Sequence, residues 1–372
     1  MNKKFDDIRP YMDAEIPEAM NRIANSELLP EIAKFVFPEK DLSEVQKILR
    51  GYTNIHDFQV ETMYALNSQI IKSSIDQLTY SGIEHLKPEK SYLFISNHRD
   101  IVMDSMLLQY ILHINGFRTT EITFGSNLMS SQLIIDIGRS NKMFKVMRGE
   151  TPREFYKTSL HLSEYIRHAI TERNESIWIA QRNGRTKDGN DATDQGILKM
   201  FCMSGGKDTV HALNTLNIVP IAISYQYEPC DFFKTRELYQ SRNGEKYVKE
   251  KNEDLVSVLT GIKQFKGNVH VGICEPLRLE ELQLLMCEKS SNDFFKGVAN
   301  LIDSRIFKNY KLNDTNYIAH DIRSKSDVYA SQYTPNAKEE FLRRFHQVLD
   351  KFDVDKEIAG QIFLGIYANV IK

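Results

Sequence analysis

The sequence lacks the features that would place the chain across a membrane, outside the cell or on a nucleic acid. No run of about 18 uninterrupted apolar residues occurs, so we expect no helix that spans a bilayer. The segment 1–7 has two lysines but no apolar run behind it, which is not the pattern of a secretory signal. The formal net charge of −2 gives no reason to expect nucleic-acid binding.

Cysteine is scarce, and no pair of cysteines has the spacing of a metal site. We expect Cys202, Cys230, Cys274 and Cys287 to be reduced, buried thiols, as is typical of a cytoplasmic protein. The sequence also lacks a Gly-x-Ser-x-Gly nucleophile elbow, an internal repeat and a low-complexity tract. Its 41% hydrophobic and 26% charged residues are typical of a soluble globular protein, and 372 residues suffice for one large or two modest domains.

The order of apolar patterns divides the chain into three regions. Residues 1–76 carry only helical periodicity, which predicts a small helical domain or cap. Residues 77–278 alternate short apolar runs with helical patterns, which predicts an α/β fold with a mostly parallel central sheet flanked by helices. Residues 279–372 are helical again, apart from a polar, tyrosine-rich loop over 309–334 with one short helix. The predicted strands are 78–83, 92–95, 122–125, 143–147, 176–180, 218–224 and 269–274, and the helices between them are 101–115, 130–137, 152–174, 208–216 and 254–265.

The first candidate for chemistry is His98, which follows the apolar run Tyr92–Ile95 at the point where that strand should end. A helical pattern starts at Ile101, so we expect His98 on a strand-to-helix turn with Asp100 and Asp104 nearby. A carboxylate beside a histidine fixes the tautomer and stabilises the imidazolium, as a general base requires. A purely structural hydrogen-bonded pair is the alternative interpretation.

Arginine follows two further predicted strands. Arg148 ends the strand 143–147 and would face the same sheet edge as His98, because the carboxyl ends of parallel strands meet there. The strand 176–180 leads into a loop with Arg182, Arg185 and Lys187. In that loop Gly184 and Gly189 would allow close backbone approach, which makes the loop a candidate phosphate cradle. Surface or capping roles are the alternative for these cations.

The central region resembles the glycerolipid acyltransferase superfamily, which includes the glycerol-3-phosphate and 1-acylglycerol-3-phosphate acyltransferases, and is most similar to a divergent bacterial subfamily. The resemblance spans about residues 78–275 and rests on four motifs in order: Asn97-His98 with Asp100 or Asp104, the strand from Phe144 to Arg148, Asn183-Gly184-Arg185 in place of a Glu-Gly-x-Arg block, and Val219-Pro220.

Two positions depart from the family pattern. Asp104 lies six residues after His98 where the family has five, which leaves open whether Asp100 or Asp104 is the partner of His98. Asn183 stands where the family has glutamate, which leaves the acceptor open.

The resemblance implies an O-acyltransferase of phospholipid biosynthesis that needs no cofactor and no metal. His98 would deprotonate an acceptor hydroxyl, Asp104 or Asp100 would orient His98, and the hydroxyl would attack an acyl thioester. The implied substrate-binding residues are Arg148, Arg182, Asn183, Gly184, Arg185 and Lys187. The implied partners are acyl-CoA or acyl carrier protein as donor, and glycerol 3-phosphate, lysophosphatidate or another anionic acceptor. The implied location is cytoplasmic, peripheral on the inner face of the cell membrane.

Other interpretations stay open. The same histidine and carboxylate acting on water would make the protein a thioesterase, and the two departures allow a non-catalytic lipid- or phosphate-binding protein. The apolar segment 128–137 would either line an acyl tunnel or pack in the core.

Overall fold

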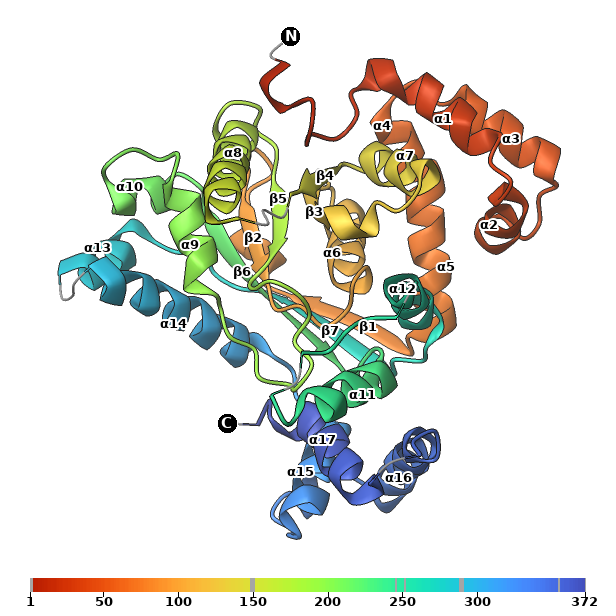
Figure 1. Cartoon of the computed structure of the whole chain (residues 1–372), viewed down its shortest axis with the longest axis vertical. Helices are drawn as coiled ribbons and strands as arrows, with labels where there is room; N and C mark the ends of the chain where they lie inside the picture. The colour runs from red at the N-terminus through yellow and green to blue at the C-terminus, as the bar shows by residue number, and fades with distance from the viewer. Residues whose placement is uncertain are drawn as a thin grey trace.

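The centre of the molecule is a seven-stranded sheet, seen in a computed structural model that describes residues 3–147, 151–244, 246–250, 252–287, 291–353 and 355–371. The strand order is β1-β7-β6-β2-β5-β3-β4, and neighbouring strands are parallel except for the antiparallel pair β6 and β7. The predicted α/β fold with helical N- and C-terminal regions is confirmed (Figure 1). The strands are β1 (Gln77–Ser81), β2 (Leu93–Ser96), β3 (Glu121–Gly125), β4 (Met143–Val146), β5 (Ile177–Ala180), β6 (Ile218–Tyr225) and β7 (Asn268–Ile273).

The sheet is covered on both faces because alternate side chains of its central strands are apolar. In β2, Leu93 and Ile95 enter one buried cluster with helices α8, α9 and α14, whereas Phe94 enters another with α5 and α6. This burial on both faces explains why the central strands β2, β5 and β6 are continuous apolar runs in the sequence. The helices are α5 (Tyr64–Ser74), α6 (Met103–Ile114), α8 (Pro152–Thr171), α9 (Gln195–Cys202) and α14 (Ser291–Asn309).

Two helices of the central region were not predicted, α9 and α11 (Asp231–Ser241). The buried residues of α11 are Asp231, Lys234 and Thr235, so this helix has no apolar stripe for a periodicity argument to detect. The other helices of the region match predicted ones, namely α7 (Gln132–Ser140), α10 (Thr209–Asn214) and α12 (Glu253–Lys263).

The N-terminal helices pack as a layer against α7. Within the region of helical periodicity, residues 16–36 form two helices, because Asn25 ends α1 and Pro30 stands in the first turn of α2. Their apolar cluster also takes in Leu133 and Ile137 of α7. These helices are α1 (Ile16–Ala24), α2 (Leu29–Val36), α3 (Leu42–Gly51), α4 (Ile55–Asp57) and the π-helical η3 (Phe58–Met63), which continues into α5.

The C-terminal helices lie at the opposite end of the molecule from the N-terminal ones (Figure 1). The short helix expected within 309–334 is α15 (Asp314–Ser324), and it packs with α16 (Pro335–Leu349) and α17 (Lys356–Ala368) around one apolar cluster. Before them, α13 (Leu279–Cys287) and α14 pack on the sheet itself. No helix in the described residues is both long and apolar enough to cross a membrane.

Candidate active site

His98 lies where the sequence places it, on the turn between β2 and α6. Its Nδ1 is 2.9 Å from Asp104 Oδ2, and its ring packs edge-on against Trp178 with the centroids 5.8 Å apart. The imidazole is largely buried, with 14% of its side chain exposed. Within the described residues no hydrogen bond to Nε2 is found, so this nitrogen is available to a substrate.

The turn decides between the two candidate carboxylates. Asp104 Oδ2 accepts hydrogen bonds from His98 and from the backbone N–H groups of Arg99 (2.7 Å) and Asp100 (3.0 Å). Asp100 Oδ1 instead accepts from the backbone N–H groups of Val102 and Met103, so Asp100 caps the start of α6. Asp104 is therefore the partner of His98.

Tyr225, at the end of β6, completes the environment of Asp104. Its hydroxyl donates to Asp104 Oδ1 at 2.7 Å, and both side chains are buried. Burial alone would raise the pKa of Asp104, but the hydrogen bonds from His98, the Asp100 N–H and Tyr225 outweigh it and lower that pKa. The carboxylate is thus held ionised beside the imidazole. Sequence reasoning missed Tyr225, since a tyrosine closing an apolar strand gives no signal.

The cation-rich loop after β5 lies against the His98 turn. The Thr186 N–H donates to the carbonyl of His98 at 2.7 Å, which ties the two segments together. Arg185 lies near the Cys230 thiol and the Asp254 carboxylate. Burial raises the pKa of Cys230 to about 11, although the charge of Arg185 opposes this rise. Burial also raises the pKa of Asp254, but Lys249, Asn127 and the charge of Arg185 outweigh it and lower that pKa. One buried nitrogen of the Arg185 guanidinium has no partner among the described residues.

The remaining residues predicted for this loop have different surroundings. Lys187 forms an ion pair with Glu237 of α11, so it is not free for a ligand. Arg182 has no hydrogen bond or ion pair within the described part of the chain, and Asn183 and Gly184 are exposed beside it. Arg148 lies outside the described residues.

The expected role of Gly189 in approaching a ligand is wrong. Its φ is +80°, and a Cβ there would stand 2.4 Å from the carbonyl oxygen of Ile366 in α17. Gly189 therefore allows α17 to pack on the loop, and the Asn369 side chain fixes this contact by donating to the Asp188 carbonyl at 2.7 Å.

A buried charge network behind His98 was also missed. Arg99 is fully buried, donates to Asp191 at 2.6 Å and to Glu228 at 3.4 Å, and stands over the ring of Tyr310. Glu228 in turn accepts from Lys234 of α11 at 2.6 Å. The one sign of this network in the sequence was an arginine directly after the candidate histidine. If such an arginine is fully buried, it requires carboxylates around it.

A cavity of about 770 Å³ lies between the N-terminal helices and the sheet. Its apolar wall includes Leu66 and Ile70 of α5, Val102 and Met106 beside and within α6, and Ile262 of α12. Val102 follows His98 by four residues along the chain, whereas His98, Asp104 and Arg185 are not among the residues that line the cavity.

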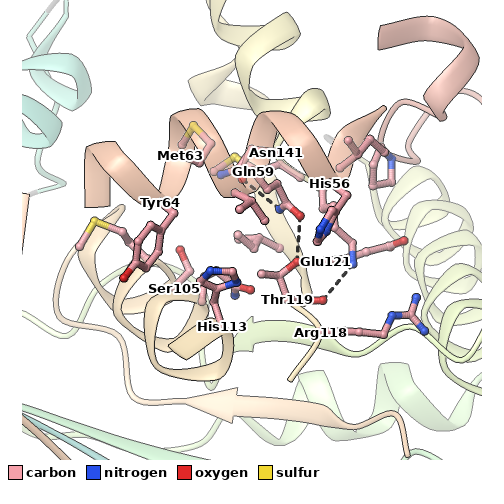
Figure 2. Close-up of a pocket in the computed structure, with 18 of the residues that line it drawn as sticks. His56, Gln59, Met63, Tyr64, Ser105, His113, Arg118, Thr119, Glu121 and Asn141 are labelled. Carbon is pink, nitrogen blue, oxygen red and sulfur yellow. Dashed lines mark hydrogen bonds between the residues drawn. The ribbon is translucent and has the colours of Figure 1, made fainter. Parts of the chain in front are cut away.

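The far part of the cavity is polar. Figure 2 shows Gln59 donating to Asn141 and accepting from Thr119, at 3.1 and 2.9 Å. Glu121 and Arg173 form an ion pair there, at the amino end of β3 and thus at the sheet edge opposite to His98. The segment 128–137 contributes no residue to the wall of this cavity, and its Leu133 and Ile137 pack against the apolar cluster of the N-terminal helices.

Possible metal ligands and the cysteines were located within the described residues. No group of three or more His, Cys, Asp and Glu side chains there is arranged to hold a metal ion. The four cysteines are free thiols, and Cys287 is exposed, contrary to the expectation that all four are buried.

Comparison with known proteins agrees with the motifs. Residues 77–224 match the family model described as Acyltransferase. No curated protein matches the chain. Among solved structures, the 1-acyl-sn-glycerophosphate acyltransferase PlsC from Thermotoga maritima is similar to 79% of this chain and 94% of its own, with a TM-score of 0.41 and 12% sequence identity. Residues 77–224, the segment that contains His98, Asp104 and Arg185, thus match an acyltransferase domain, which supports acyltransferase activity for this protein.

Proposed function

We propose that the protein is an O-acyltransferase of phospholipid biosynthesis. It moves a fatty acyl group from acyl-CoA or acyl carrier protein to a hydroxyl of glycerol 3-phosphate, lysophosphatidate or a related anionic lipid precursor. The observation that carries the proposal is the hydrogen bond from His98 Nδ1 to Asp104, on a turn bonded to the Arg185 loop inside the acyltransferase segment.

His98 acts through Nε2, because Nδ1 is bonded to Asp104. Nε2 takes the proton of the acceptor hydroxyl while the hydroxyl oxygen attacks the thioester carbonyl. The ester C–O bond forms, the C–S bond breaks, and the imidazolium gives its proton to the departing thiolate. Asp104 remains ionised and stabilises the imidazolium.

Arg185 is the first candidate for the anionic group of the acceptor. Its unpartnered guanidinium nitrogen can donate to a phosphate oxygen, and the guanidinium suits such a contact. Arg182, which has no ion pair within the described residues, is the second candidate. We retain Arg148 as a third candidate on the sequence motif alone.

The acyl chain of the donor occupies the cavity beside α6. The cavity volume of about 770 Å³ lies within the range of sites that enclose organic ligands. We propose further that the protein works in the cytoplasm, peripherally on the inner face of the cell membrane, because its product would be a membrane lipid.

The test is acyl transfer from long-chain acyl-CoA and acyl carrier protein to a panel of glycerophosphate and lysolipid acceptors. His98→Ala should lower acceptor-dependent thiol release by at least about 100-fold, because it removes the general base. His211→Ala, at an exposed position of α10, is the matched control and should retain wild-type activity.

Each other outcome has a definite meaning. Thiol release that needs no acceptor would make the protein a thioesterase. A folded wild-type protein without turnover on any donor would support a binding protein instead. Equal activity of His98→Ala and wild type would remove His98 from the mechanism.

A further inference from the structure

The helix α12 has its polar side inside and its apolar side outside. Its buried residues are Glu253, Ser257 and Gly261, which lie on one face at intervals of four. Leu255, Val256 and Leu259 are 48%, 46% and 46% exposed. A surface helix ordinarily buries its apolar stripe, so this exposed face requires an explanation.

The candidate active site fixes the inner face of α12. Gly261 packs directly on Asp100, since a Cβ at this position would stand 2.2 Å from Asp100 Oδ2. The Cys230 thiol donates to the Ser257 carbonyl at 3.2 Å. Arg236 of α11 donates to Glu253 at 3.1 Å, and Figure 1 shows α12 beside α5 and α11. Turning the helix to bury its leucines would press one of them against the His98 turn.

The exposed face leads into the large cavity. Leu255, Leu259 and Ile262 are spaced by four and three residues, so they share one stripe of α12. Leu255 and Leu259 are exposed, whereas Ile262 lines the cavity. The stripe is therefore a continuous apolar path from the surface to the space that we assign to the acyl chain.

Exposed lysines occur at the end of this helix and in the segment before it. Lys263 is the last residue of α12, Lys246 lies in the segment that leads to α12, and both are exposed, as is Val248 (81%) in the same segment. Apolar side chains bordered by lysines are typical of helices that lie in the interface of an anionic bilayer.

We infer that the α12 face, defined as Leu255, Val256 and Leu259, docks the enzyme on a membrane surface that contains anionic lipid. The bilayer then covers the apolar face and meets the cavity along the stripe that ends at Ile262, so an acyl chain can pass between them without crossing water. The inference rests on the proposed function for the identity of the chain, but the docking itself can be measured without turnover.

The experiment is flotation of the protein with phosphatidylcholine vesicles, with and without phosphatidylglycerol. The double variant Leu255→Gln/Leu259→Gln should bind the mixed vesicles about tenfold or more weakly than wild type, because two leucines no longer enter the apolar layer. The control is Leu284→Gln/Val328→Gln, two exposed apolar positions on α13 and after α15, which should bind as wild type. Lys246→Glu/Lys263→Glu should remove the preference for phosphatidylglycerol.

Turnover separates this inference from the proposed function. The α12 double variant should acylate soluble glycerol 3-phosphate at the wild-type rate and lose activity on lysophosphatidate embedded in vesicles. If the double variant loses vesicle binding while the wild-type protein is inactive with every substrate, the docking surface is supported and the proposed function is refuted. Unchanged vesicle binding in the double variant would overturn the inference. Lost binding to acyl carrier protein alone would overturn it too and assign α12 to a protein partner.

Discussion

The N-terminal and C-terminal helices are joined to the central region by the same kind of contact. At the N-terminal side, Arg22 of α1 donates both to Asp136 Oδ1 (2.7 Å) and to Asp136 Oδ2 (2.8 Å), and the Tyr11 hydroxyl donates to Asp136 Oδ1 (2.7 Å). Asp136 belongs to α7, and its carboxylate is buried. This contact, called the N-terminal joint, thus consists of one arginine, one buried aspartate and one tyrosine.

The C-terminal side repeats the arrangement with other residues. Arg344 of α16 donates to both oxygens of Asp231 at 2.5 and 3.0 Å, and the Tyr367 hydroxyl of α17 donates to Asp231 Oδ2 at 2.9 Å. Asp231 is fully buried at the start of α11.

The two joints differ in what lies behind them. Behind Asp136 is the apolar cluster of α1, α2 and α3, and α5, the helix that ends the N-terminal region, forms a wall of the large cavity. Behind Asp231 the Tyr367 hydroxyl accepts from the Glu228 N–H, and Glu228 accepts from Arg99, the residue after His98. One helical region therefore shapes a binding space, and the other holds the candidate catalytic turn.

The largest expected effect comes from replacing each aspartate, which tests whether the two contacts have different roles. We expect Asp231→Asn and Asp136→Asn each to lower the free energy of unfolding by roughly 1–3 kcal/mol, because each leaves a charged partner poorly compensated. Asp231→Asn should also lower kcat by about tenfold or more, since a displaced His98 turn loses its alignment with substrate. Asp136→Asn should leave kcat unchanged. Denaturant unfolding and steady-state kinetics on both variants test this, and an equal loss of kcat would contradict the division of roles.

A second variant tests the N-terminal role in the cavity. Leu66→Trp places a larger side chain in the wall beside α6. We expect kcat/KM to fall about tenfold for the longest acyl thioesters and to stay near wild type for short ones, because each methylene excluded from the cavity forfeits about 0.8 kcal/mol. Val328→Trp, exposed near the C-terminal helices, is the control. A uniform loss at all chain lengths would show that Leu66 does not limit chain length.

The last prediction concerns two buried lysines and affects stability rather than turnover. Lys234, near Asp231, donates to the carboxylate of Glu228, whereas the partners of Lys266 among the described residues are the Ser74 hydroxyl and two backbone carbonyls. Burial lowers the pKa of Lys266 to about 8. Between that pH and about 10.4, the usual pKa of an unfolded lysine, the unfolded state binds one proton more than the folded state.

The free energy of unfolding should therefore rise with pH across this window, by roughly 3 kcal/mol from this group. Lys266→Met should remove this rise, because it removes the titrating group. The measurement is the difference between wild type and Lys266→Met in denaturant unfolding, which cancels other titrating groups. A difference that does not change with pH would mean that water or a rearrangement hydrates Lys266.

The sequence by itself determined the sheet and the position of His98. The seven strands could be predicted, and most readily the central strands β2, β5 and β6, because these bury apolar side chains on both faces and this burial appears as a run of apolar letters. The position of His98 could be predicted in the same way, because a residue that follows a parallel strand lies at the carboxyl edge of the sheet once the strand is identified. The acyltransferase resemblance rests on these same segments, and the family match confirms it.

Only the tertiary structure decided which polar groups meet. The choice of Asp104 over Asp100 depends on the path of the turn, and the pairing of Lys187 with Glu237 joins a loop to α11. The buried face of α11 and the exposed leucines of α12 contradict hydrophobic periodicity, because both helices pack on the charged surroundings of the His98 turn. Apolar burial leaves a local pattern in the sequence, whereas a buried charge is stabilised by partners that are far away in the chain, and only the fold brings them together.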